Sequence, residues 1–142
     1  MAGNIKTLEN FTKKTVVVSG ANGFTGRFVC LELKKRKIDF IALLRPDSDI
    51  SWMQKNKINF RYADLRKSEQ LKIALKDCEV FLNIASIGFG SIYSILEASR
   101  YVGVKRGVFI STTAIFTKLN AKSKKIRKEA ELAIKESGLN WT

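Results

Sequence analysis

The chain has 142 residues, of which 45% are hydrophobic, so it is long enough for one domain with a hydrophobic core. It contains two cysteines and no histidine, which excludes most zinc sites and histidine-based catalytic triads, and no metal site is expected. The formal net charge of +13 attracts phosphates of any kind, but outside Lys118–Lys128 the basic residues are scattered, and no aromatic residue is interleaved with that cluster, so no specific nucleic-acid binding is expected.

The N-terminal stretch MAGNIKTLENFTKK is polar and charged, which argues against a signal peptide. No apolar run approaches the roughly 18–20 residues that span a bilayer. We therefore expect a cytoplasmic protein that contacts no membrane. Cys30 and Cys78 are expected to stay free and to pack as small apolar groups, because disulfides are rare in cytosolic proteins.

Runs rich in β-branched residues alternate with amphipathic stretches along the chain. In chain order, strands are predicted at Thr15–Ser19, Asp39–Leu44, Ile58–Ala63, Glu79–Ala85 and Gly107–Ser111. Helices are predicted over Gly26–Lys37, after an N-cap at Ser68, along the face Ile92, Ile95, Leu96 and Ser99, and from Ile126 to a C-cap at Gly138. This alternation predicts an α/β fold, a doubly wound parallel sheet of strand order 3-2-1-4-5 with helices on both faces.

Three glycines, Gly20, Gly23 and Gly26, directly follow the first strand and open the first helix. In a dinucleotide site the first glycine permits a tight turn, the second lets the backbone approach the pyrophosphate, and the third lets helix and strand pack closely. The N–H groups at the start of the helix then favour an anion. The alternative is a plain strand-to-helix turn. The predicted cofactor contacts in this loop are Gly20, Asn22, Gly23, Phe24, Thr25 and Gly26.

The spacing Gly-x-x-Gly-x-x-Gly resembles that of the extended and atypical branch of the short-chain dehydrogenase/reductase superfamily, which includes nucleotide-sugar epimerases and dehydratases and NmrA-like proteins. Three further segments carry the resemblance, which spans residues 15–142: ADLRKSEQL, VFLNIAS and ASRYVGVKRGVFIST. It implies an NAD(P)-binding Rossmann domain in which Asp64 and the backbone of Leu65 contact the adenine ring. It also implies that Ala85 and Ser86 line the dinucleotide.

The residue at the end of the second strand bears on the choice of cofactor. Sites that prefer NAD place an acid there to hold the ribose diol, whereas this chain has Arg45. A guanidinium suits a 2′-phosphate, and Arg27 would assist it, although Asp47 and Asp49 lie nearby and weigh against this role. We expect NADP in preference to NAD. The alternative is that Arg45 is a solvated loop charge.

Enzymes of this superfamily use a Tyr-x-x-x-Lys pair on the helix after the fifth strand, assisted by a Ser or Thr at the end of that strand. The resemblance places Thr113 at the Ser/Thr position. With the helix aligned on Glu131, Ser123 stands at the Tyr position and Arg127 at the Lys position. Neither side chain replaces the pair, because serine is a far weaker acid than tyrosine and arginine stays protonated. The catalytic pair is therefore expected to be absent.

Two functions stay open for a chain of this kind. It is either the nucleotide-binding part of an epimerase/dehydratase-like or reductase-like oxidoreductase, or a non-catalytic NADP(H)-binding sensor or scaffold of the NmrA-like kind. Residues 1–142 are expected to form one domain without a separate substrate domain, ending at Leu139–Thr142 inside an expected sixth strand. The chain would be either a piece of a longer protein or a naturally short one.

The fifth strand is expected to lie at the edge of the sheet. The stub Leu139–Thr142 is too short to cover it fully, which would leave Gly107–Ile110 with unpaired backbone groups. Exposed edges pair with other chains, and two-fold dimers are the commonest closed assemblies. We therefore expect a homodimer through this edge.

Overall fold

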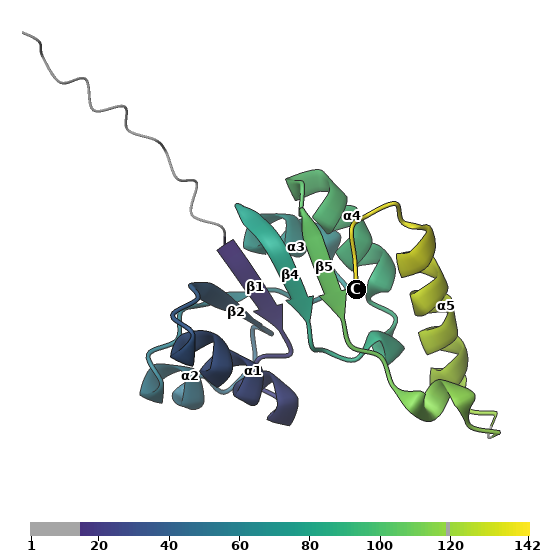
Figure 1. The fold of residues 1–142 in the computed structure, drawn as a ribbon, viewed down its shortest axis with the longest axis horizontal. Helices are drawn as coiled ribbons and strands as arrows, with labels where there is room; N and C mark the ends of the chain where they lie inside the picture. The colour runs from purple at the N-terminus through teal and green to yellow at the C-terminus, as the bar shows by residue number, and fades with distance from the viewer. Residues whose placement is uncertain (1–14, 119) are drawn as a thin grey trace, which may run out of the picture.

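The computed structural model describes residues 15–118 and 120–142. Five strands form one parallel sheet in the order β3-β2-β1-β4-β5, which confirms the predicted fold class. Figure 1 shows β1 between β2 and β4, with β5 beyond β4. The central strand β1 pairs with both β2 and β4, so that Val17 lies opposite Ile41 on one side and Phe81 on the other. The strands are β1 (Thr15–Ser19), β2 (Phe40–Leu44), β3 (Phe60–Tyr62), β4 (Cys78–Asn83) and β5 (Arg106–Phe109).

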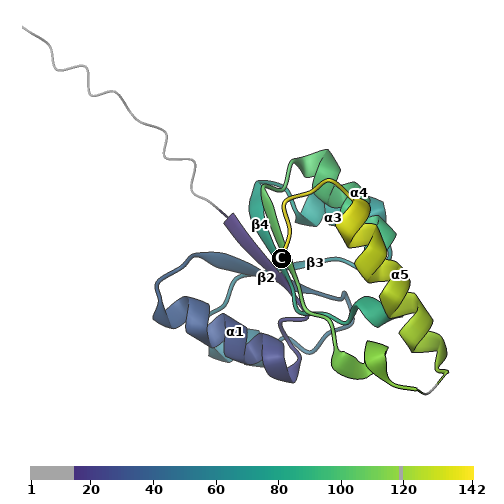
Figure 2. The same ribbon diagram turned by 45° about the vertical axis from the view of Figure 1, so that its right-hand side comes forward.

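Helices cover both faces of the sheet, so the sheet is doubly wound. α1 and α2 lie on one face, and α3, α4 and α5 lie on the other (Figures 1 and 2). The α-helices are α1 (Phe24–Lys35), α2 (Ser51–Lys55), α3 (Ser68–Ala74), α4 (Ile92–Val102) and α5 (Lys122–Glu136). Two 3₁₀ turns, η1 (Ile87–Phe89) and η2 (Thr113–Phe116), follow β4 and β5. Among the described residues, no helix combines the length and the apolarity needed to cross a membrane.

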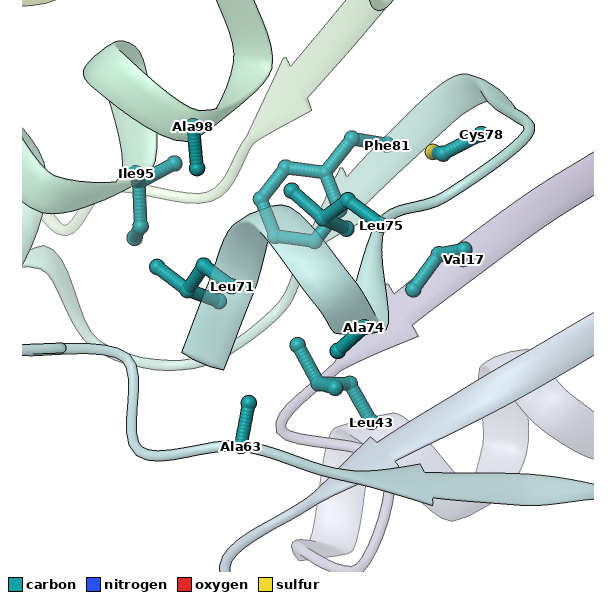
Figure 3. Packing of buried hydrophobic residues seen from close by; sticks show 10 residues of the cluster. All are labelled: Val17, Leu43, Ala63, Leu71, Ala74, Leu75, Cys78, Phe81, Ile95 and Ala98. Carbon is teal, nitrogen blue, oxygen red and sulfur yellow. The ribbon is translucent and has the colours of Figure 1, made fainter. Parts of the chain in front are cut away.

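The core has two layers because successive strand residues point to opposite faces of a sheet. Val17 and Phe81 point toward α3 and α4, where they pack with Leu71 and Ile95 in the cluster that Figure 3 shows. Val16 and Val18 point the other way, toward α1 and α2. The second cluster contains Val16, Val18, Ala21, Cys30, Ala42, Leu44, Met53 and Ile58.

Both cysteines are buried and unpaired, as predicted. Burial raises the pKa of the Cys30 thiol to about 11 and that of the Cys78 thiol to about 12, because a thiolate is poorly solvated inside the core. These thiols are therefore uncharged at neutral pH, and they contribute to packing.

The structure corrects several predicted boundaries. α1 begins at Phe24, two residues before the predicted start, because Gly23 adopts an extended conformation and serves as its N-cap. Ser68 is the first residue of α3 and Lys67 is its N-cap, so the predicted cap at Ser68 is wrong. α2 was not predicted, since its five residues are too few to show a helical period. The predicted C-cap at Gly138 is wrong by one residue, because Ser137 is the C-cap of α5 and Gly138 follows it with φ +73°.

The predicted open edge at β5 is wrong over Gly107–Phe109. The Gly107 N–H donates to the Asn140 carbonyl at 2.7 Å, and the Thr142 N–H donates to the Gly107 carbonyl at 2.8 Å. The Phe109 N–H donates to the Thr142 carbonyl at 2.9 Å, so the last residues run along the strand. Three residues suffice because β5 itself is only four residues long. The expected homodimer is therefore no longer supported by an open edge at β5, and it stays a prediction.

Candidate functional site

The turn from β1 into α1 needs glycine at two of its three positions for reasons internal to the fold. Gly20 has φ +66°, and a Cβ there would lie 2.5 Å from the backbone nitrogen of Ala85. A Cβ on Gly26 would lie 2.0 Å from the carbonyl oxygen of Gly20. The first glycine therefore permits the turn and the contact with the end of β4, and the third permits the close packing of α1 on β1.

Gly23 differs from the other two glycines of the loop. It is exposed, its φ of −76° and ψ of 171° are open to any residue, and a Cβ would meet only the Gly20 carbonyl oxygen, at 3.4 Å. The protein itself therefore tolerates a side chain at this position. Gly23 is also the N-cap of α1, so the space above it faces the N–H groups of the first helical turn.

A cleft of about 800 Å³ opens at the carboxyl ends of the strands, beside this turn. Open parallel sheets bind ligands in this position, where the strand order reverses between β1 and β4. Eight of the predicted cofactor residues line it: Gly20, Asn22, Gly23, Arg45, Asp64, Leu65, Ala85 and Ser86. The lining residues that the sequence did not single out for binding are Leu43, Leu44, Asp47, Ser48, Asp49, Ala63, Arg66, Phe89 and Ser91.

Three predicted residues of the glycine loop lie outside the lining of the cleft. Gly26 is buried beneath the turn. Phe24 is 82% exposed, and its ring packs edge-on against Phe28 on the outer side of α1, with the ring centroids 5.2 Å apart. Thr25 is exposed on the same helix. Their predicted contacts with a cofactor stay predictions.

Asn22 connects the glycine loop to the segment after β2. Its Nδ2 donates to the carbonyl of Asp49 at 2.7 Å, and its Oδ1 accepts a hydrogen bond from Arg27 at 2.9 Å. The Arg27 guanidinium lies 5.1 Å from the centre of the Trp52 ring, outside the lining of the cleft. The side chains of Asn22 and Arg27 thus hold two loops of the site together.

The loop after β2 carries the three charged residues that the sequence analysis named there, Arg45, Asp47 and Asp49. Arg45 is exposed at the end of the strand, and its Nε lies 3.7 Å from a carboxylate oxygen of Asp47. Such an exposed pair contributes little to stability, so Arg45 is free to bind an anion instead. The Asp49 carboxylate accepts hydrogen bonds from the backbone and hydroxyl of Ser51, which lower its pKa.

At the end of β3, Asp64 and Arg66 form a two-point ion pair. The Nε and Nη2 atoms of Arg66 donate to the two carboxylate oxygens of Asp64 at 3.1 and 2.9 Å. These hydrogen bonds lower the pKa of Asp64 from 3.8 to about 2. Asp64 is therefore ionised throughout the neutral range.

Acid titration is expected to reveal this pair. Between about pH 4 and pH 2 the unfolded chain binds a proton at Asp64 that the folded chain does not, so the free energy of unfolding falls as the pH is lowered. In urea titrations, Asp64→Asn should make this fall shallower. The pair is partly solvated, which limits the change. An equally steep fall in the variant would contradict the role of Asp64.

Buried hydrogen bonds fix the end of β4. The Ser19 hydroxyl donates to Asn83 Oδ1 at 2.6 Å, and Asn83 Nδ2 donates to the Ala85 carbonyl at 2.9 Å. Ser86 follows, and its Oγ accepts from the N–H of Gly88. Sequence reasoning missed Ser19 and Asn83, although each is a polar residue that ends its strand directly after an apolar run of three residues.

The residues aligned with the catalytic positions lie on or before α5. Thr113 begins η2, where it is exposed and does not line the cleft. Ser123 is half-buried on α5. Arg127 lies against η1, because a Cβ on Gly88 would come within 2.9 Å of its Nε. On the same side, the Ser111 hydroxyl donates to Glu131.

Solved structures of three proteins share this fold. An NADPH-dependent quinone oxidoreductase of Escherichia coli superposes with a TM-score of 0.75 at 23% identity, over 89% of this chain and 46% of its own. A nucleoside-diphosphate-sugar epimerase of Pseudomonas aeruginosa gives 0.77 at 14%, over 90% and 50%. A short-chain dehydrogenase/reductase of Veillonella parvula in complex with NADP gives 0.76 at 16%, over 91% and 67%. The chain thus spans about half the length of the first two proteins.

No curated protein matches the sequence. A family model described as NAD(P)H-binding matches residues 20–142, which begin at the first glycine of the loop and include every strand after β1. Together with the five-stranded parallel sheet, this match shows that the chain belongs to the NAD(P)H-binding family.

Proposed function

We propose that the cleft binds NADP(H) with the pyrophosphate against the N-terminus of α1. Gly23 is the observation that carries the proposal. The fold tolerates a side chain there, so the bare backbone leaves space for a ligand beside the N–H groups of a twelve-residue helix. Those N–H groups and the helix dipole favour a negatively charged group.

The two halves of the dinucleotide would lie on either side of this point. Arg45, Asp64 and Leu65 line the cleft on the side of β2 and β3, and we assign them to the adenosine half. Ala85 and Ser86 line it on the side of β4, and we assign them to the nicotinamide half. The support for this division is the strand order, which places β2 and β4 on opposite sides of β1.

Arg45 is expected to set the preference for NADP over NAD. A charge-assisted pair with the 2′-phosphate contributes about 1.5–3 kcal/mol, so Arg45→Ala should weaken NADP binding roughly ten- to a hundredfold and leave NAD binding nearly unchanged. Calorimetric titration with both cofactors measures this. The matched control is Arg36→Ala, which removes an exposed arginine at the C-terminal end of α1, away from the cleft. Equal losses for the two cofactors would contradict the role of Arg45.

We propose that this chain is the dinucleotide-binding part of a reductase-like or epimerase-like oxidoreductase. The support is the fold that the chain shares with a quinone oxidoreductase and a nucleoside-diphosphate-sugar epimerase. The proposal is tested by steady oxidation of NADPH with a quinone or a carbonyl acceptor. The oxidation is measured as the loss of dihydronicotinamide absorbance. Ser111, Thr112 and Thr113 carry the hydroxyl groups that follow β5, and Thr113 is the one at the aligned Ser/Thr position.

The second candidate is a sensor or scaffold that binds NADP(H) without chemistry. It is favoured by Ser123 and Arg127 at the aligned Tyr and Lys positions, and the sequence from Thr112 to Thr142 contains no tyrosine. Binding of NADPH without turnover of either acceptor would support this candidate.

The cytoplasmic location, the homodimer and the lack of specific nucleic-acid binding stay predictions. Light scattering across a salt series tests the homodimer.

A further inference from the structure

Arg66 is held in place unusually firmly for a residue whose side chain is 70% exposed. Its N–H donates to Asp64 Oδ1 at 2.9 Å, and its carbonyl accepts from the Ser94 hydroxyl at 3.0 Å. Its guanidinium forms the two-point pair with Asp64 described above. Asp64 is anchored in turn, because its N–H donates to Gln70 Oε1 at 2.9 Å. An exposed arginine ordinarily keeps its rotamer freedom, so this order indicates a defined surface on the cleft.

The pairing leaves the flat faces of the guanidinium available. Nε and Nη2 lie on one edge of the guanidinium plane and donate to Asp64. The ion pair therefore occupies that edge and leaves both faces of the plane uncovered. A planar, delocalised cation binds aromatic rings through such a face. Buried Ala63 and half-buried Leu65 line the same part of the cleft and give it an apolar floor.

The strand order determines which part of the ligand would reach this surface. The proposed pyrophosphate lies at the end of β1, and Arg45, at the end of β2, is assigned to the 2′-phosphate on the adenosine ribose. The next strand outward is β3, which leads into Asp64 and Arg66. A group attached to that ribose and directed away from the pyrophosphate therefore arrives at Arg66, and in NADP(H) this group is the adenine base.

We propose that Arg66 stacks on the adenine base of the bound dinucleotide and that Asp64 is the positioning residue that holds its guanidinium flat. This inference rests on the proposed function. It gives Asp64 a different role from the predicted contact with adenine, since both of its carboxylate oxygens already accept hydrogen bonds from Arg66. The inference also gives the two arginines of the cleft different roles. Arg45 is assigned to the 2′-phosphate and Arg66 to the adenine base.

The test measures the affinity of the Arg66 variants for NADPH and NADH by calorimetry. Arg66→Ala should weaken the binding of both cofactors by the same factor, roughly five- to a hundredfold, because both carry adenine. Arg66→Lys keeps the charge without the planar face and should recover at most a small part of the loss. Arg36→Ala, which removes an equally exposed arginine paired with Glu32, should leave both affinities unchanged.

Double-variant analysis tests the positioning role of Asp64. Asp64→Asn should weaken binding in the wild-type background and add little in the Arg66→Ala background, because it acts through Arg66. An equal effect in both backgrounds would overturn this role.

Four other outcomes would count against the inference. A loss confined to NADPH would make Arg66 a phosphate ligand and overturn the stacking, and recovery of the affinity in Arg66→Lys would do the same. Unchanged affinity in Arg66→Ala would overturn the inference while leaving the proposed function intact. A wild-type protein that binds neither cofactor would overturn the proposed function, and this inference with it.

Discussion

Gly23→Val is expected to abolish dinucleotide binding while the protein stays folded. The Cβ of the new side chain meets only the Gly20 carbonyl oxygen within the protein, at 3.4 Å, which is an ordinary contact distance. The side chain would instead fill the space proposed for the pyrophosphate and lie over the N–H groups that favour it. The affinity for NADPH should fall on the order of a hundredfold or more, measured by calorimetry.

The matched control for this experiment is Ala121→Val. Ala121 is the exposed N-cap of α5 and has an extended backbone, like Gly23, but it lies outside the cleft. Both variants place valine at a helix N-cap, so both should lose about 1 kcal/mol of stability or less. Only Gly23→Val should lose binding. Wild-type affinity in Gly23→Val would remove the basis for placing the pyrophosphate at this loop.

Gly26→Ala is expected to destabilise the protein, although the same change inside a helix usually stabilises it by about 1 kcal/mol. The added Cβ would lie 2.0 Å from the Gly20 carbonyl oxygen and 2.7 Å from the Ala21 Cα, and both are backbone atoms that cannot rotate away. We expect a loss of about 3 kcal/mol or more in the free energy of unfolding and a fall of roughly 10 °C or more in Tm.

Urea and thermal unfolding measure this loss, and Thr25→Ala provides the comparison. Thr25 precedes Gly26 on α1 and is exposed, so its replacement should change the stability by less than about 0.7 kcal/mol. A Gly26→Ala protein as stable as the wild type would show that α1 moves away from β1 without cost. In that case the third glycine would have no packing role.

The sequence predicted the sheet order and the place of the glycine loop because both follow from local patterns. Alternating apolar strands and amphipathic helices leave few topologies, and three glycines between a strand and a helix are typical of a dinucleotide-binding turn. The sequence spacing assigned Gly20 and Gly26 to the fold and Gly23 to the ligand, and the structure adds the clash distances that a Cβ would have at each of the three positions.

The rest of the site depends on contacts between segments that are distant in the sequence. Ser19 and Asn83 are 64 residues apart, and nothing local marks them as partners. Arg66 was one basic residue among 26 until its pairing with Asp64 distinguished it. The error at the β5 edge has a related cause, since the number of residues in the final segment did not show how closely it follows the strand.

The hydrogen bonds of Asn22 have a consequence for the rate of binding. Asn22 joins the glycine loop to Asp49 and Arg27 through hydrogen bonds made within the protein, so two walls of the cleft are connected by contacts that need no cofactor. In a prearranged site, the ordering of loops reduces the binding free energy only slightly. Association should therefore occur in a single kinetic phase, and differences in affinity between related cofactors should arise mainly from how long each stays bound.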